Sequence, residues 1–360
     1  MKKTLTQTLA LLADAYREFS SKRLFWISLI LSAAVILVIG GVGISGNHVT
    51  FFGFNIPNPD PDAIVPDLPT LYHGMFVRLG VECWLSWGAM ILAVASTGSM
   101  IPDFLAGGSV DLYLCRPMGR VRLYLTKYAA GLLFVALQAA VFAVAGYFTL
   151  GLRGGLWAGD IFICIPILVC IFCYLFCISA LLGVVTRSAP ASVMLTILFW
   201  VMLVVVYQVN QTLTERRLDE QRTIAMLGRE VGPMETHGMA MRRADAAARL
   251  AQSRKNLADI ESWRRWTVLA QRILPKAIPT NNIMVNRLAH SPPPMKGDPE
   301  DFSGARELGE VSLLGQDRDI NRRVEALERR QSPLCIVGSS LAFEAVILAL
   351  GAWCFKRRDY

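Results

Sequence analysis

The chain has 360 residues, of which 54% are hydrophobic and 18% are charged, and its formal net charge is +8 at pH 7. Its mean hydropathy is +0.43. This composition is too apolar for an average soluble protein, and too charged for a chain that is embedded in lipid along its whole length. It predicts a membrane protein that carries a polar insertion.

The first 23 residues precede the first long apolar run and predict a cytoplasmic amphipathic helix that lies in the membrane surface. Apolar side chains recur there at helical spacing, while charged side chains take the other faces; the apolar set is Leu5, Leu9, Leu12, Tyr16 and Phe19. The alternative is a solvated N-terminal arm, which would not need such a stripe.

Six apolar runs are long enough to cross a bilayer, since about 20 helical residues span ~30 Å of hydrocarbon. They cover residues 24–44, 79–101, 128–150, 161–185, 191–209 and 334–355. The runs are continuously apolar rather than alternating, which favours helices over a closed barrel. We therefore expect an all-α polytopic protein with six transmembrane helices. No cleavage pattern follows the first run, so we expect it to be retained.

The placement of Lys and Arg predicts the orientation, because cations in short loops mark the cytoplasmic side. Thirteen of these cations lie on one side: before the first run, between runs two and three, between runs four and five, and after the sixth run. The opposite short loops, residues 48–75 and 151–160, hold only Arg153. We expect both termini to be cytoplasmic, in a plasma membrane of the bacterial inner type. Residues 58–69 are rich in proline and predict an irregular outer loop.

The same orientation places residues 210–333 outside the cytoplasm as a polar insertion. This segment holds 21 of the 36 basic residues and 17 of the 28 acidic residues of the chain. We expect the helix of the fifth run to continue into it, followed by a second helical segment over 241–274, a linker over 291–304 and an apolar stripe, Ile320, Val324 and Leu327, that leads into the sixth run. The expected architecture is a small helical domain on two stalks. Its expected partners are lipid headgroups or an envelope protein, and not nucleic acid.

Residues 101–127, between the second and third runs, form an unusually charged connection in which apolar residues alternate with charges. Gly107 and Gly108 allow a turn, and Ser109 can cap a short amphipathic helix that begins near Val110. Arg116, Arg120 and Arg122 form a cationic rim. The pattern predicts a surface that docks on a cytoplasmic partner.

This connection resembles that of the ABC-2 class of ATP-binding-cassette transporter permeases. The shared pattern has a glycine, an acid, a leucine pair, a proline, an arginine and a lysine, and it stands here as Gly108, Asp111, Leu112, Leu114, Pro117, Arg120 and Lys127. The likeness extends to YREFSSKRLFW before and into the first run, to six spans with both ends inside, and to the terminal CFKRRDY. It covers roughly residues 1–210 and 334–360. The insertion is far longer than the outer helices of the family. The resemblance suggests ILPKAIPTNN as a remnant of those helices.

The resemblance implies that residues 101–127 are a coupling helix seated in a separate ATPase subunit. The candidate coupling residues are Pro102, Asp103, Gly108, Asp111, Leu114, Arg116, Pro117, Arg120, Arg122 and Lys127. The chain has no phosphate-binding G-x-x-x-x-G-K-[ST] segment, so we expect no catalytic residues and no cofactor on it, with ATP and magnesium on the partner. A second permease, as a copy or a paralogue, would complete the transporter.

Polar residues inside the apolar runs are costly in lipid and give the candidate translocation path: Glu82, Gln138 and Glu344. The alternative for Glu82 is a pair with Arg78, and the alternative for Glu344 and Gln138 is hydrogen bonding between helices. Cys170, Cys173 and Cys177 share a helix face, but no histidine or acid lies on that helix, so we expect packing residues and no metal site. The four histidines lie far apart in the sequence.

Three functions follow from these patterns. The first is an ABC-2 exporter permease. The second is a non-transporting membrane anchor whose insertion scaffolds envelope partners. The third is a proton-coupled transporter that uses Glu82 and Glu344, which the absence of an inverted repeat does not favour.

Overall fold

A computed structural model describes residues 17, 23–45, 48–56, 68–106, 119–230, 240–289 and 332–357. Within these residues, six helical segments are long and apolar enough to cross a membrane. They correspond one to one with the six apolar runs, and the expected all-α polytopic class is confirmed. Three expected segments lie outside the described residues: the linker 291–304, the apolar stripe that leads into the sixth run, and the N-terminal amphipathic helix. Of that helix, only Arg17 and Arg23 are described.

The first three spans are α2 (Arg23–Gly41), a composite second span, and α7 (Arg120–Gly154). The second span consists of α3 (Leu68–Met75), the π-helical segment η1 (Phe76–Ala89), α4 (Met90–Gly98) and α5 (Met100–Ala106). The second span begins at Leu68, eleven residues before the start of the apolar run 79–101 that predicted it. Pro69 is compatible with this start, because a proline in the first turn of a helix loses no intrahelical hydrogen bond.

The last three spans are α8 (Cys164–Thr186), which follows a short 3₁₀ turn η2 (Gly159–Ile163), then α9 (Ala189–Glu230) and α14 (Pro333–Arg357). Between α9 and α14, the described part of the insertion forms α10 (Ala240–Ile273) and α11 (Ala277–Ala289).

A small antiparallel sheet, which the sequence analysis did not predict, caps the end of α2. It contains β1 (Val42–Ser45), β2 (His48–Phe51) and β3 (Phe54–Ile56) in the order β1-β2-β3. The first span therefore ends at Gly41 and not at Ile44. Phe52 and Gly53 form the second turn with positive φ angles of 48° and 87°, as tight hairpins require. The Tyr72 hydroxyl donates a hydrogen bond to the Val42 carbonyl and ties α3 to the sheet.

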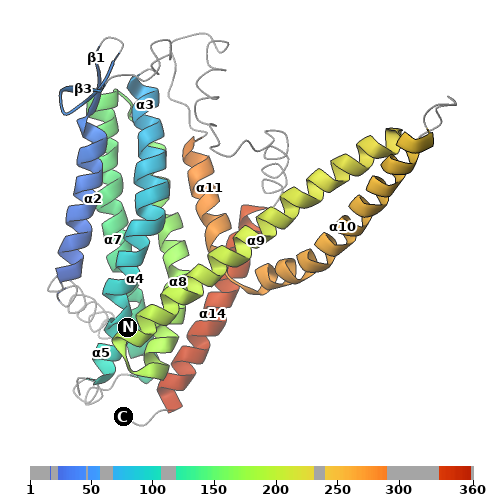
Figure 1. The fold of residues 1–360 in the computed structure, drawn as a ribbon. Helices are drawn as coiled ribbons and strands as arrows, with labels where there is room; N and C mark the ends of the chain where they lie inside the picture. The colour runs from blue at the N-terminus through green and yellow to red at the C-terminus, as the bar shows by residue number, and fades with distance from the viewer. Residues whose placement is uncertain are drawn as a thin grey trace.

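The helices form a bundle in which α8 is central (Figure 1). It packs against α7, α9, α14, α4, α5 and α11. Of its most apolar window, 61% is buried inside the chain, compared with 22% for α9 and for α14. The sheet lies at one end of the bundle, hereafter the sheet end, and α5 lies at the other, hereafter the α5 end. Helices α9 and α14 consequently expose most of their apolar surface at the side of the bundle.

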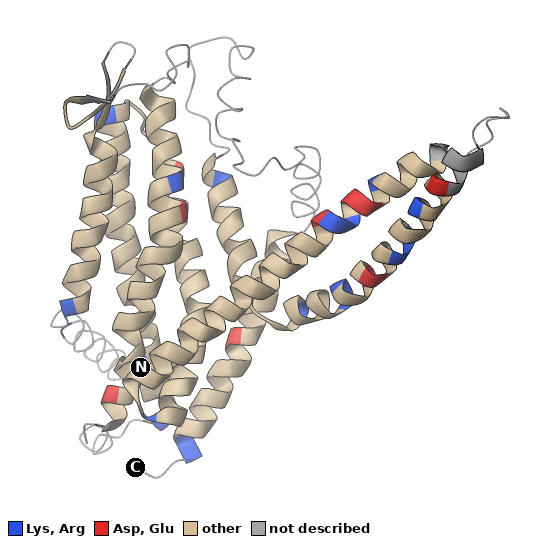
Figure 2. Cartoon of the chain, viewed as in Figure 1, with Lys and Arg blue, Asp and Glu red and all other residues tan. Residues whose placement is uncertain are grey.

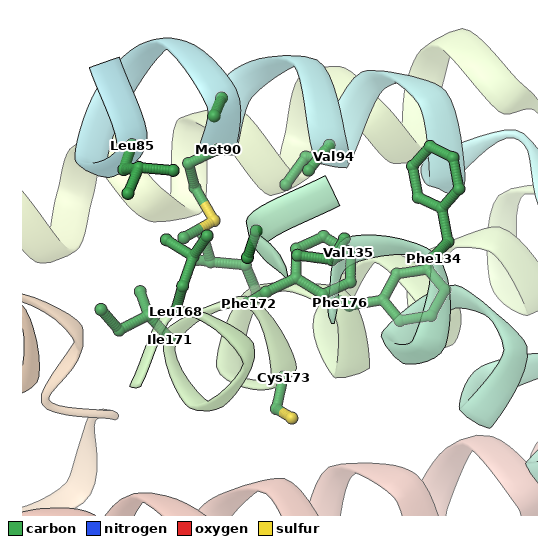
Figure 3. Packing of buried hydrophobic residues seen from close by; sticks show 14 of the residues in the cluster. Leu85, Met90, Val94, Phe134, Val135, Leu168, Ile171, Phe172, Cys173 and Phe176 are labelled. Atoms are coloured by element: carbon green, nitrogen blue, oxygen red, sulfur yellow. The ribbon is translucent and has the colours of Figure 1, made fainter. Parts of the chain in front are cut away.

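The core is built from aromatic and branched side chains where α7, α8 and the second span meet (Figure 3). Phe172 and Phe176 of α8 stack with ring centroids 5.1 Å apart, and Tyr128 of α7 stacks on Phe176 at the same separation. Gly131 permits this close approach, since a Cβ at that position would lie 2.5 Å from the Phe176 ring. The α7–α8 contact is therefore fixed by ring packing against a glycine.

Helix α9 runs far beyond its apolar part, as the sequence predicted, and α10 folds back along it to form an antiparallel hairpin that slants away from the bundle (Figure 1). Helix α11 then returns to the bundle, where it contacts α8, α14, η1 and α9. The expectation of a separate domain on two stalks is only partly met in the described residues: α9 and α10 form one projecting hairpin, and α11 belongs to the bundle.

Charged side chains of the described residues gather at the two ends of the bundle and along the α9–α10 hairpin, while the middle of the bundle is largely uncharged (Figure 2). This distribution is that of an apolar slab with polar surfaces on both sides, which is what a bilayer requires.

Candidate functional site

Helix α5, at the start of the candidate coupling connection, is held firmly in the bundle. It packs against α4, α8 and α9. Pro102 is buried against α8, where a Cβ on Gly183 would lie 3.0 Å from the Pro102 Cδ. Asp103 is exposed, and its backbone N–H donates to the Ser99 carbonyl at 2.8 Å. The apolar side of α5 thus faces three helices, while a carboxylate points outward.

The other side of the connection is the start of α7. Arg120 is the first residue of α7 and its Nη1 donates to the carbonyl of Lys356, near the end of α14, at 3.5 Å. Cations near a helix C-terminus interact favourably with its last carbonyls. Arg120 and Arg122 are half-exposed at the α5 end. The first turn of α7 is therefore in contact with the sixth span.

Lys127 does not belong to this exposed rim, because its side chain is buried. It is 7% exposed, and its Nζ lies 5.4 Å from the centroid of the Phe104 ring on α5. A cation over an aromatic face is an attractive interaction that strengthens when water is excluded. Lys127 thus joins α7 to α5 across the connection. Gly108, Asp111, Leu114, Arg116 and Pro117 lie outside the described residues.

The three candidate translocation residues face three different surroundings. Glu82 is exposed on η1, and Arg78, four residues earlier, is exposed as well. Gln138 of α7 is buried, and its Nε2 has no hydrogen-bond partner among the described residues. It borders a small void of about 10 Å³, which Ser32 and Leu168 also line. The structure does not bring these residues onto one path.

Glu344 of α14 takes part in a buried contact between helices. Its Oε1 accepts a hydrogen bond from the Tyr128 hydroxyl at 2.8 Å, and the same hydroxyl lies 3.1 Å from the Cys173 carbonyl of α8. The side chain therefore links α14 to α7 and α8. This is the hydrogen-bonded alternative that the sequence left open for Glu344.

The cysteines on α8 are free thiols inside the bundle: Cys170 is half-buried, and Cys173 and Cys177 are buried. The Cys177 Sγ lies 3.3 Å from the Tyr174 carbonyl. Within the described residues, no group of three or more His, Cys, Asp and Glu side chains is arranged to hold a metal ion.

A feature that no sequence pattern indicated is a cavity of about 1210 Å³ between α9, α10, α11 and the start of α14. Its lining residues are distant in sequence, from Leu203 to Ile336, and only the folding back of α10 and α11 brings them together. The signal that could have pointed to it is the series of basic residues on α10 and α11.

These features define the class of the molecule: it is a polytopic α-helical membrane protein with a projecting helical hairpin. Comparisons of the chain with models of protein families, with curated proteins and with solved structures find no match.

Proposed function

We propose that the chain is the transmembrane permease subunit of an ABC-2 type exporter, in which a separate ATPase drives movement of a substrate across the membrane. The observation that carries the proposal is the construction of the connection between the second and third spans. Its two described arms are anchored to the bundle and to each other: α5 packs against α4, α8 and α9, and the start of α7 contacts α14 and, through Lys127, α5.

Such a connection can transmit force. A displacement of α5 by a partner would act directly on α8, the most buried span, and on α9, which carries the projecting hairpin. Packed helices shift as units, because close-packed interiors transmit strain. The exposed charges beside these anchors, Asp103, Arg120 and Arg122, supply a polar surface on which an ATPase can dock.

In this proposal the α5 end faces the cytoplasm of a bacterial inner membrane, both termini are cytoplasmic, and the hairpin lies outside. The excess of Lys and Arg in the short loops of that side supports this orientation. Magnesium and ATP reside on the partner, since this chain has no phosphate-binding loop.

A second permease completes the transporter, and α9 offers it a surface. Apolar side chains recur along one exposed face of α9; this face consists of Met194, Leu198, Val201, Val205 and Val209. Together with the low burial of α14, this face supports pairing with a second permease, as a copy or a paralogue.

The docking claim is tested by recovering the ATPase with the purified chain. We expect wild type to retain a separate P-loop ATPase, encoded next to this gene, and to hydrolyse no ATP by itself. The triple variant Arg116→Glu, Arg120→Glu and Arg122→Glu should lose the ATPase. The matched control reverses three exposed cations of the hairpin, Arg249, Arg254 and Lys255, and should keep it. An ATPase that remains bound to the first variant would remove the docking claim.

A second candidate function, a membrane anchor whose hairpin scaffolds envelope proteins, is favoured by one observation: the outer half of the α9–α10 hairpin is charged and projects away from the bundle (Figure 2). An ATPase gene beside this one distinguishes the two functions. A gene without such a neighbour, and envelope proteins that are lost when residues 222–255 are deleted, would favour the anchor.

A further inference from the structure

The cavity between α9, α10, α11 and α14 has a strongly cationic wall. Five basic residues line it: Arg217, Arg264, Arg272, Lys276 and Arg287. No carboxylate stands among the described residues that line it. Glu261, which lies outside the lining, has its Oε1 3.4 Å from the Arg217 Nε. Arg217, Arg264 and Lys276 are half-buried. Clustered cations that are partly withdrawn from water favour an anionic group among them.

The cavity is also graded from apolar to polar along α9. In order along α9, the lining residues are Leu203 and Val206, then Tyr207 and Asn210, then Thr214 and Arg217. These residues recur every three or four positions and so share one face of the helix. Ile336 of α14 adds to the apolar part. An occupant that matches this gradient has an apolar portion and an anionic portion.

Hydrogen bonds made by lining residues hold the walls in place. The Asn210 Nδ2 donates to the Gln271 Oε1 at 3.1 Å, and the Asn282 Nδ2 donates to the Tyr207 hydroxyl at 2.9 Å. The Lys276 backbone N–H donates to the Ser340 Oγ at 2.9 Å. These bonds join α9, α10, α11 and α14, so the cavity is a formed site rather than a gap between loosely placed helices.

The apolar part of α9 ends beside the cavity. Its apolar run ends at Val209, and the next residue, Asn210, is bonded to Thr267 and Gln271 of α10. The last turns of α10 therefore lie beside the end of the apolar part of α9. On this part of α10, Trp263, Trp266, Leu269 and Ile273 form an exposed stripe, and the two tryptophans are 68% and 71% exposed. Tryptophan beside arginine on an apolar stripe is typical of a helix in the lipid interface.

We propose that this cavity binds an anionic phospholipid. The phosphate lies among Arg264, Arg272, Lys276 and Arg217, and an acyl chain lies along Leu203, Val206 and Ile336. The interfacial stripe on the outer side of α10 favours a lipid over a soluble anion, since it places the cavity entrance within reach of the bilayer. The inference does not rest on the transport proposal, because a lipid site requires no ATPase.

The test uses the full chain purified in detergent and native mass spectrometry. Phosphatidylglycerol and phosphatidylcholine with identical acyl chains are added separately, and a third arm adds inorganic phosphate. We expect wild type to retain phosphatidylglycerol over phosphatidylcholine. The variant Arg264→Gln, Arg272→Gln and Lys276→Gln should bind it about a hundredfold more weakly, from three lost cation contacts of roughly fivefold each.

The matched control is Arg249→Gln, Arg254→Gln and Lys255→Gln, which removes the same charge from exposed positions of α10 outside the cavity, and it should bind phosphatidylglycerol like wild type. Val206→Trp fills the apolar part of the cavity without changing its charge. If the triple variant does not fold, this variant tests the lipid proposal in its place. It should lose phosphatidylglycerol.

The proposal would be overturned by equal retention of the two lipids by wild type, by equal loss in the cavity variant and its control, or by unchanged lipid binding in Val206→Trp. Displacement of phosphatidylglycerol by inorganic phosphate alone would identify a site for free anions, and the lipid assignment would then be wrong.

Discussion

At the scale of single residues, the polar side chains of the spans act as connectors between helices. The Lys127 ammonium lies over the Phe104 ring, and the Glu344 carboxyl accepts from the Tyr128 hydroxyl. A polar group in hydrocarbon is costly without a partner, so each of these side chains constrains the helix opposite it. Glu344, a candidate for the translocation path, and Lys127, a candidate coupling residue, thus both have a structural role in the bundle.

The contact at Glu344 can be tested by removing one hydroxyl. Tyr128→Phe leaves the buried carboxyl without its donor, so we expect a loss of about 1–3 kcal/mol in the free energy of unfolding. Thermal unfolding of the purified chain measures it. Tyr147→Phe on the same helix is the control, since the Tyr147 ring packs on Trp157 without a hydroxyl contact of this kind. Equal stability of the two variants would contradict the contact.

Gly131 offers a second test at this scale. Gly131→Ala should destabilise the bundle by about 1–3 kcal/mol, because a methyl group would overlap the Phe176 ring. Gly338 of α14 has open space around it, so Gly338→Ala should raise helix stability by up to about 1 kcal/mol. Opposite shifts in the unfolding temperature are expected. Stabilisation by both substitutions would mean that the α7–α8 approach is looser than described.

At the scale of elements, the α9–α10 hairpin is held by polar contacts near its base and by a partly exposed ion pair farther along. The base contains Asn210, which bonds with both Gln271 and Thr267. The ion pair joins Arg217 and Glu261, whose side chains are 30% and 46% exposed. Exposed pairs contribute about 0–1 kcal/mol, whereas a lost bond between partly buried groups leaves its partners unsatisfied.

We therefore expect Asn210→Ala to loosen α10 from α9 and to increase hydrogen exchange in the last turns of α10 by about tenfold. Glu261→Gln, which removes only the ion pair, should change exchange there by less than about threefold. Hydrogen exchange followed by mass spectrometry measures the exchange rate of the last turns of α10 in each variant and so distinguishes the two effects. If Glu261→Gln had the larger effect, the ion pair and not Asn210 would hold the hairpin.

At the scale of the whole molecule, the arrangement of the spans separates a buried centre from an exposed side. Helix α8 is surrounded by other helices, whereas α9 and α14 face outward. Among the described residues, basic side chains of the short connections gather at the α5 end (Figure 2). Arg153, at the sheet end, has its Nε 3.1 Å from the Gly40 carbonyl. That contact binds the third span to the C-terminus of the first, where a cation is stabilising.

The orientation predicts which positions react with a membrane-impermeant thiol reagent on intact cells. In a background with Cys115 and the exposed Cys83 and Cys335 changed to serine, Gln252→Cys on α10 should react from outside. Gly119→Cys, at the start of α7, should react only after permeabilisation. Both positions are exposed, so a difference reports the side of the membrane. Reaction of Gly119→Cys on intact cells would invert the orientation and would remove the coupling proposal with it.

Sequence reasoning recovered the spans well but their boundaries less well. The six apolar runs predicted the six spans, since each run must form a helix to satisfy its backbone in lipid. The start of the second span at Leu68 was missed, because it directly follows a proline-rich stretch and because its first residues, LPTLYHGM, mix apolar with polar side chains. The sheet after α2 was missed as well, because strands of three or four residues carry too little alternation to stand out beside a long apolar helix.

The sequence by itself determined that this protein has six helices able to cross a membrane and a long polar insertion rich in helix formers, because hydropathy and helical length are properties of local residues. Only the tertiary structure decided that α11 returns to the bundle, that Lys127 is buried against Phe104, that Glu344 meets Tyr128, and that five basic residues surround one cavity. Each of these depends on how distant helices pack, and side-chain complementarity between such helices has no signature in the order of residues along the chain.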